Sequence, residues 1–441
     1  MKLLEYQQAF GAWDRTSEIM RRSIDNWFRL YYHSGGDKES DPCQRIAYSI
    51  VSKLCKAIFS EYRIEAEATF YRGILQELAG CHRQAMELTL VGGESYIKPC
   101  IGEKGITLTV IPRDRVLVFG RDPEGELTDV GTVERCTQGR YYYTLLERRT
   151  LDEQGLLTIQ NALYRSLNAH TLGAQVDLSS LPRYSGLAES YTYPTALGGV
   201  GLVRLRTPML NCVDGSCEGV SVYAPAVDLI ANIDRNEAQL CGEFERGESR
   251  IITSRDLLDE NQRLTDHLFI GLDEDPQQVG FHIFSPQLRQ EAFLARKQEY
   301  LRNVESVIGL KRGMLADVNT NQRTATEISA SEGEFNLTVL DLQRMWERAV
   351  QQLMQLCRLL AELYALGRQP EPMLQIDWGN GILFDEDKLW QEYRQMALDG
   401  LIAPEVALGW RFHMPAVTEE DRAAIRKRYM PPKQAQEPAN A

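Results

Sequence analysis

The strongest catalytic signature in the chain is the pentapeptide around Cys217. Gly215-Ser-Cys217-Glu-Gly219 matches the pattern of a nucleophile elbow with cysteine in the central position. In α/β hydrolases that pattern needs a strand before the nucleophile and a helix after it. The preceding residues, Asn211-Cys-Val-Asp214, are typical of a turn, which favours a loop over an elbow. Because the pentapeptide still matches the pattern, a cysteine hydrolase centred on Cys217 is kept as an alternative function.

Other patterns that could hold a metal or a nucleotide lack essential members. Cys212 and Cys217 have no histidine or second cysteine pair nearby, so they do not make a zinc site. The glycine-rich Leu197-Gly-Gly-Val-Gly201 lacks the lysine and hydroxyl residue of a phosphate-binding loop. The acidic runs Asp273-Glu-Asp275 and Asp385-Glu-Asp387 lack the ligand spacing of an EF-hand. We therefore expect no catalytic residue, metal or cofactor, and a protein that is not an enzyme.

The net charge indicates which partners the chain can bind, and the cysteine content indicates its cellular compartment. The 441 residues carry a formal net charge of −13, whereas proteins that bind DNA tightly are normally basic. Such a chain is an ordinary acidic protein, or one whose surface DNA must pass without adhering. Nine scattered cysteines with no closely spaced pairs indicate buried thiols in a reducing cytoplasm. No apolar run is long enough to cross a bilayer, so we expect no membrane contact.

The elements that would position any site change from predicted helices to predicted strands along the first half of the chain. Apolar residues at helical spacing predict helices over Asp14–Tyr32, Pro42–Phe59 and Thr69–Val91, the second with Asp41 as its N-cap. An antiparallel meander follows, with short β-prone segments separated by turns rich in glycine, aspartate and proline. The β-prone segments are Ser95–Lys98, Ile106–Ile111, Val116–Phe119, Thr128–Arg135, Tyr141–Arg149, Leu156–Tyr164 and a returning strand at Val203–Thr207.

The second half of the chain reads as two helices around a small insert, then one very long helix. Residues 222–245 and 285–308 are amphipathic, and two β-prone pieces lie between them. The loop-like residues 309–323 lead to the capping box Thr324-Ala-Thr-Glu327, which opens a helix that runs to about Leu366. At 1.5 Å per residue such a helix spans roughly 60 Å. Further helical pieces at Glu386–Asp399, Pro404–Phe412 and Glu419–Tyr429 complete the chain before a polar tail.

Three stretches, taken in order and spacing, resemble the portal proteins of long-tailed phages, the group with SPP1-like portals. The first is Glu218-Gly-Val-Ser-Val-Tyr-Ala224 with the helix that follows it, similar to the family's first stem helix. The second is Arg323-Thr-Ala-Thr-Glu-Ile328, similar to the start of the long wing helix. The third is Asp377-Trp-Gly-Asn-Gly-Ile-Leu-Phe-Asp385 with Asp399-Gly-Leu-Ile-Ala-Pro-Glu405, similar to the strand and the start of the crown.

The resemblance implies an α+β portal fold with a helical and antiparallel-sheet wing, a two-helix stem, a small α/β clip, a long wing helix and a short helical crown. In this chain the wing would be residues 1–221. The other expected regions are stem helix 1 at 222–245, the clip at 246–284, stem helix 2 at 285–308, the tunnel loop at 309–323, the long wing helix and strand at 324–378, the crown at 379–430 and a disordered tail at 431–441. The short crown and tail depart from the family and leave contacts inside the capsid in doubt.

The resemblance also implies a function. A portal is a ring homo-oligomer, usually of twelve subunits, through which double-stranded DNA enters and leaves the capsid without sequence-specific contacts. The implied partners are the terminase large subunit, a head-tail adaptor, and the major capsid and scaffolding proteins. The protein would be in the virion, at the portal vertex, and in the host cytoplasm during assembly. Lys311, Arg312 and Arg323 of the tunnel loop are candidates for transient phosphate contacts, or for ion pairs between subunits. A cellular helical scaffold built on the long helix is a further alternative.

Overall fold

The computed structural model describes residues 3–33, 42–102, 105–247, 250–254, 269–272, 281–284, 287–317, 325–379, 386–412, 414, 416 and 418–430. Contacts divide the chain into two units, each described by itself below. The first consists of residues 1–59 and 63–376, and the second of residues 60–62 and 377–441. Among the described helices none is both long enough and apolar enough to cross a membrane.

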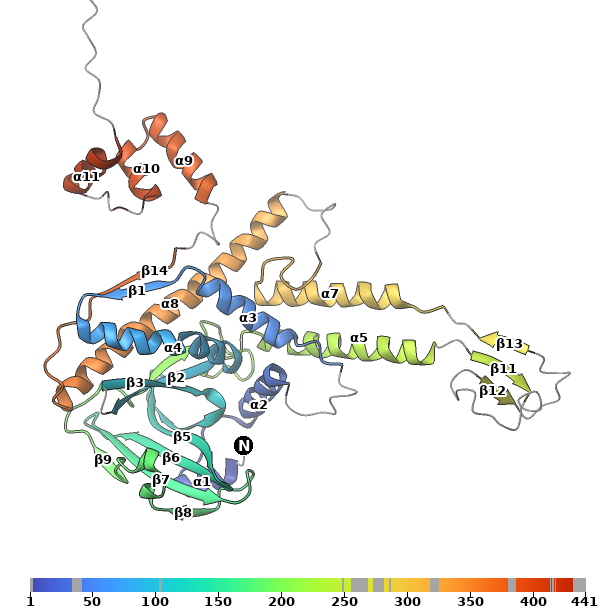
Figure 1. Ribbon diagram of the computed structural model, residues 1–441, viewed down its shortest axis with the longest axis horizontal. Helices are drawn as coiled ribbons and strands as arrows, with labels where there is room; N and C mark the ends of the chain where they lie inside the picture. Colours follow the sequence, from blue (N-terminus) through green and yellow to red (C-terminus); the bar gives the residue numbers. More distant parts are fainter. Residues whose placement is uncertain are drawn as a thin grey trace, which may run out of the picture. The chain divides into compact units, whose positions relative to one another are not determined.

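Helices described in the first unit are α1 (Leu3–Phe10), α2 (Glu18–Tyr32), α3 (Ile46–Ile58), α4 (Thr69–Gly92), α5 (Val227–Arg246), α7 (Gln290–Ile308) and α8 (Ala325–Leu363) (Figure 1). The second unit contains α9 (Glu386–Leu398), α10 (Pro404–Arg411) and α11 (Glu419–Tyr429), as predicted. Aromatic pairs hold these last three helices: Tyr393 stacks on Trp410, and Phe412 stacks on Tyr429. The polar tail predicted to be disordered lies outside the described residues.

The predicted meander forms two separate antiparallel sheets. The larger one has the order β4 (Val116–Arg121), β5 (Leu127–Gln138), β6 (Tyr141–Leu151), β7 (Leu157–Ser166) and β8 (Ala174–Val176), with β9 (Ser190–Thr192) also paired to β7. The smaller one has the order β10 (Val203–Arg206), β2 (Glu94–Gly102) and β3 (Gly105–Pro112). The α+β class and the returning strand near Val203 are therefore confirmed.

Two further small sheets were only partly visible in the sequence. Between α5 and α7 lie β11 (Arg250–Ser254), β12 (Phe269–Leu272) and β13 (Phe281–Phe284), in the order β12-β11-β13. The sequence predicted two of these strands and missed β12, which pairs with β11 in parallel. The fourth sheet joins β1 (Arg63–Ala66) to β14 (Leu374–Asp377), strands more than 300 residues apart.

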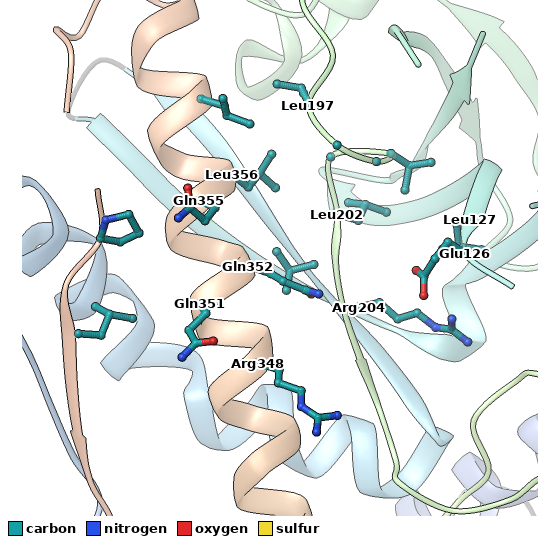
Figure 2. Close-up of a pocket in the computed structure, with 18 of the residues that line it drawn as sticks. Glu126, Leu127, Leu197, Leu202, Arg204, Arg348, Gln351, Gln352, Gln355 and Leu356 are labelled. Carbon is teal, nitrogen blue, oxygen red and sulfur yellow. The ribbon is translucent and has the colours of Figure 1, made fainter. Parts of the chain in front are cut away.

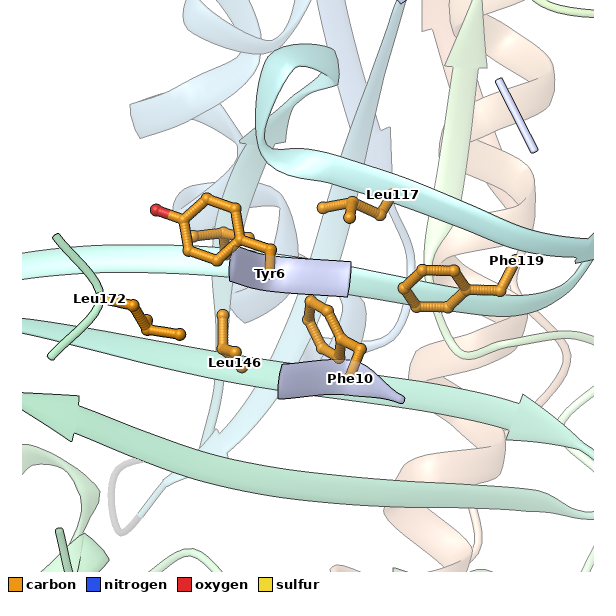
Figure 3. Packing of buried hydrophobic residues seen from close by; sticks show 7 residues of the cluster. Tyr6, Phe10, Leu117, Phe119, Leu146 and Leu172 are labelled. Atoms are coloured by element: carbon orange, nitrogen blue, oxygen red, sulfur yellow. The ribbon is translucent and has the colours of Figure 1, made fainter. Parts of the chain in front are cut away.

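The first helix covers one face of the larger sheet. Tyr6 and Phe10 of α1 pack onto Leu117, Phe119 and their neighbours in the sheet (Figure 3). The rings of Phe10 and Phe119 lie 5.3 Å apart between centroids, a distance typical of favourable aromatic contacts. Helix α1 was not predicted, because its eight residues are too few for a clear periodic pattern.

Five predicted helix boundaries were wrong by three to five residues. Helices α2, α5 and α7 begin at Glu18, Val227 and Gln290 rather than at residues 14, 222 and 285. The other two boundaries have a clear local reason. The second predicted helix begins at Ile46 rather than Pro42, since Arg45 takes a left-handed φ of 55°. The backbone amide of Gln44 donates instead to Asp234 of α5, at 2.8 Å. The long helix α8 ends at Leu363 rather than Leu366, because Ala365 also turns to a positive φ of 55°.

The apolar face of α8 is buried as the alternating spacing of four and three predicts. Trp346 is fully buried, and its ring meets that of Phe59 edge-on at 5.2 Å. The other buried members of the face are Phe335, Val339, Leu342, Ala349, Leu353, Leu356 and Leu360. The helix packs on α3 and β10 and so joins the N-terminal helices to the smaller sheet.

A network of buried charges holds the smaller sheet to the loop around residue 218. Arg113 is completely buried and donates to Glu218 at 3.0 Å, with Glu94 at 3.9 Å. Arg204 of β10 pairs with the other side of Glu94, which also accepts the backbone N–H of Gly219 at 2.7 Å. Burial by itself would raise the pKa of Glu94, but Arg204 and Arg113 outweigh it and hold the pKa at about 2.

Two glycines allow the chain to cross itself at this network. Gly93 ends α4 with a φ of 78°, and a Cβ placed there would lie 2.3 Å from the carbonyl carbon of Gly219. A Cβ on Gly219 would lie 2.2 Å from the Gly93 oxygen. Thr207 fastens the crossing, because its amide donates to Gly93 at 3.0 Å and its hydroxyl to Val220 at 2.7 Å.

We predict that Glu94→Gln lowers the stability of the folded chain at pH 7 by roughly 3–5 kcal/mol, because it leaves buried guanidinium groups without their carboxylate. The folded pKa of Glu94 lies below its unfolded value, so its contribution is present above about pH 4.5 and is lost as the pH falls towards 2. The variant should therefore lose less stability than the parent between pH 5 and pH 3. Urea unfolding at both pH values measures this, with the exposed Glu67→Gln as the control; equal losses in parent and variant would contradict the prediction.

Candidate functional site

Two of the three predicted loop cations sit together just after α7. The helix ends at Gly309, whose φ is 74°, and the chain turns back over the last turn of the helix. Lys311 is exposed, whereas Arg312 is half-buried and donates through Nη1 to the carbonyl oxygen of Arg302 at 3.2 Å. Arg323 lies outside the described residues, so its position relative to the other two stays a prediction.

The turn that carries these cations is organised by a buried carboxylate that the sequence reading missed. Glu305 is fully buried in the last turn of α7, and its Oε1 accepts the backbone N–H groups of Gly313, Leu315 and Ala316 at 3.0, 2.6 and 3.0 Å. A carboxylate that accepts several amides acts as a local template for the backbone, because charge-assisted hydrogen bonds are short and strong. The missed signal was an acid on the apolar face of α7, next to Val304 and between Leu301 and Ile308.

Two further contacts fix the remainder of the described turn. Gln298 of α7 accepts the amide of Asp317 at 2.8 Å and donates to its carboxylate at 2.9 Å. Lys53 of α3 donates to the carbonyl oxygen of Met314. Residues 309–317 are therefore held against α7 and α3, and Gly309 and Gly313, both with positive φ, belong to a fixed turn.

Helices α5 and α7 lie side by side, and the turn at 309–317 follows the end of α7 (Figure 1). Lys297 pairs with Glu237 at 2.9 Å, and Arg289 pairs with Glu243 at 2.8 Å near the strands β11 to β13 in the chain. Between the helices, the buried Asn236 donates to the carbonyl oxygen of Phe293 at 3.1 Å. A polar contact buried in a helix pair fixes the relative register of the two helices.

The structure does not support Cys217 as a nucleophile. The thiol is exposed in a turn between β10 and the short helix at Ala224–Ala226, so neither the strand nor the helix of an elbow flanks it. Its carbonyl oxygen accepts hydrogen bonds from Arg206 at 2.9 Å and Arg204 at 3.1 Å. The next two residues are the Glu218 and Gly219 of the buried network, and the pentapeptide is therefore a structural loop. Across the described residues no group of three acidic, histidine or cysteine side chains could hold a metal ion.

A groove of about 920 Å³ runs between α8 and residues 197–204 (Figure 2). One wall carries Arg348 and the amides of Gln351, Gln352 and Gln355, and the other is mostly backbone because it contains three glycines. Its lining includes one carboxylate, that of Glu126, and no histidine, serine or cysteine. This set of groups can hydrogen-bond a partner but offers no nucleophile and base pair for catalysis.

The sequence matches the family model described as phage portal protein, SPP1 Gp6-like, over residues 132–427. The matched region includes β6, the α5–α7 pair, the turn held by Glu305 and all of α8. No curated protein matches the chain. Portal proteins are structural rather than enzymatic components of the phage capsid, where they act as ring oligomers with packaging partners. With two thirds of its residues covered by that match, this chain belongs to the family of SPP1-like phage portal proteins.

Proposed function

We propose that this chain is the subunit of a ring, of twelve copies in the virion, that surrounds the channel through which double-stranded DNA enters and leaves the capsid. The observation that carries the proposal is the family match over residues 132–427, which includes a helix pair, its insert, a clamped turn and the long helix in the order that a portal requires. In this assignment α5 and α7 are the stem, the strands between them belong to the clip, and α8 crosses the wing. Helices α9 to α11 form the short crown.

The clamped turn supports a role at the channel. Residues 309–317 fold back over the end of the proposed second stem helix and present an exposed lysine beside a half-buried arginine. In a ring, such turns from all copies would together make a collar of positive charge on a subunit whose net charge is −13. A small number of cations on an acidic wall give weak, sequence-independent contacts to phosphates, so that DNA can slide. The terminase large subunit would supply the motor and dock on the clip, and a head-tail adaptor would later take its place.

We predict annular particles when the purified protein is examined by negative-stain microscopy and mass photometry. Twelve copies of a 50.2 kDa chain give about 0.6 MDa, and the ring should have a central hole wide enough for duplex DNA. A heterologous interface that closes on itself produces such a ring. A monomer or dimer at micromolar concentration in every buffer tested would contradict the proposal.

We predict that Glu305→Ala loosens the turn at 309–317 without unfolding the subunit. Three backbone amides lose a charged acceptor, so their hydrogen exchange should accelerate by roughly 10- to 100-fold. Exchange measured by mass spectrometry on the peptide that contains residues 309–317 tests this. The matched control is Glu299→Ala on the same helix, where the lost carboxylate is exposed and contacts Arg302 at 3.4 Å. Exchange in Glu305→Ala as slow as in this control would contradict the clamp.

We predict that Lys311→Glu combined with Arg312→Glu leaves ring assembly unchanged but reduces DNA packaging and retention. The change adds four negative charge units per subunit close to the passing phosphates, and the Debye length at physiological salt is about 8 Å. Packaging by purified proheads measures the effect, with terminase binding followed in parallel and expected to be normal. Arg22→Glu with Arg29→Glu on the exposed face of α2 alters charge by the same amount and is the control. Normal packaging by the loop variant would exclude a channel role for these two cations.

A further inference from the structure

We propose that the two ends of the larger sheet are the two halves of one contact between neighbouring copies of this chain, with the basic end of one copy docked on the acidic end of the next. The inference rests on the ring proposed above. A ring needs a head-to-tail interface between two unlike surfaces of the same chain, and these surfaces must be complementary. The two ends of the strands β5 to β7 meet that requirement by charge.

The register of the sheet assigns the turns to opposite ends. At one end, Asp129 of β5 pairs with Thr150 of β6, and the turns at 122–126 and 152–156 are nearby in the chain. At the other end, Gln138 pairs with Tyr141 around the β5–β6 turn. Because the strands are long and antiparallel, the two sets of turns are separated by the length of the sheet.

The basic end is built around the ring of Tyr141. The guanidinium of Arg140 lies 5.2 Å from the ring centre, and that of Arg165 on β7 lies 4.8 Å from it. Arg140 also donates to the Tyr141 hydroxyl at 3.2 Å, and this hydrogen bond together with the positive charge of both arginines lowers the pKa of the phenol. Neither arginine contacts a carboxylate in the described part of the chain, and Tyr142 beside them is 39% exposed. Tyrosine and arginine are the residues enriched at protein interfaces.

The acidic end consists of two turns. Asp122 accepts a hydrogen bond from the amide of Glu126 at 2.8 Å, and Asp152 accepts one from the amide of Leu156 at 2.8 Å. Each turn is therefore organised around an aspartate side chain. Glu124 and Glu153 at the tips are exposed, with no ion pair among the described residues.

The nearby cations at this end are already engaged. Arg148 pairs with Asp129 at 2.7 Å, and Arg121 lies 3.5 Å from Glu218 and donates to the carbonyl oxygen of Gly125 at 2.8 Å. Glu126 lies beside Arg204 on the wall of the groove in Figure 2, and the two charges interact. Glu124 and Glu153 have no ion pair among the described residues and can meet a partner.

A second copy of the chain is complementary in charge to both ends of the larger sheet, whereas DNA is complementary only to the basic end. The acidic turns repel phosphate, and a subunit with a net charge of −13 lacks the broad basic surface that DNA binding requires. Complementary charged patches favour the correct partner and orientation, because a like-charge pairing is strongly unfavourable. The sheet ends would thus set the direction in which subunits add to the ring.

The test uses two double variants with reversed ends. In Arg140→Glu with Arg165→Glu both ends are acidic, and in Glu124→Lys with Glu153→Lys both ends are basic. Each variant alone should associate at least roughly 100-fold more weakly than the parent, because every contact now joins like charges. A mixture of the two should recover assembly, since each reversed end finds its opposite on the other variant. Mass photometry and sedimentation measure the species, and circular dichroism checks that each variant is folded. The control is Arg22→Glu with Arg29→Glu, which should assemble as the parent does.

The outcomes separate this contact from the ring itself. Normal rings from either double variant would overturn the proposed contact and leave the portal assignment intact. Failure of folded variants to associate on mixing would also overturn it. If the parent associates without forming closed rings, variants that associate only when they are mixed still support the contact, while the ring proposal fails. Rings from Arg140→Glu with Arg165→Glu that retain DNA poorly would assign the basic end to DNA instead.

Discussion

The buried pairing of Glu94 and Glu218 with Arg113 and Arg204 is the interaction on which the arrangement of the first unit depends. Arg113 has no exposed surface, so its charge is tolerable only while both carboxylates remain beside it. The pairing joins β2, β10 and the loop at 211–219. Because α5 begins eight residues after Gly219, the same pairing fixes where α5 leaves the sheets.

A second buried glutamate, Glu305, holds the chain in the same way where α7 ends. Glu218 stands before α5, and Glu305 stands in the last turn of α7. The two helices and their insert are thus held at both points where they meet the remainder of the first unit. Burying a carboxylate is costly without partners, and both residues meet that cost with guanidinium groups or backbone amides. Rigid attachment of this kind suits the stem role proposed above for the two helices.

The positions of the charged side chains are as informative as the net charge of the chain. Most arginines in the described sheets pair with carboxylates or stack on tyrosines, so the exposed positive charge is confined to a few places. Lys311 and Arg312 lie at the clamped turn, and Arg140 and Arg165 lie around Tyr141 at one end of the larger sheet. In an acidic chain, these two places are assigned by the two proposals made above to different partners.

The sequence by itself determined the helices, the antiparallel strands and the family, because these depend on local periodicity and on motifs within a few residues of one another. The apolar repeat of α8, the strands β4 to β7 and the helices around the insert were all visible in that way. The roles of Glu305 and of the Cys217 loop were not, and neither was the division of the meander into two sheets. Gly219 meets Glu94 across 125 residues of sequence, and Glu305 is recognisable as a clamp only when the chain folds back over α7. Such contacts were decided by the tertiary structure alone, since burial and the pairing of distant charges arise only when separate segments pack together.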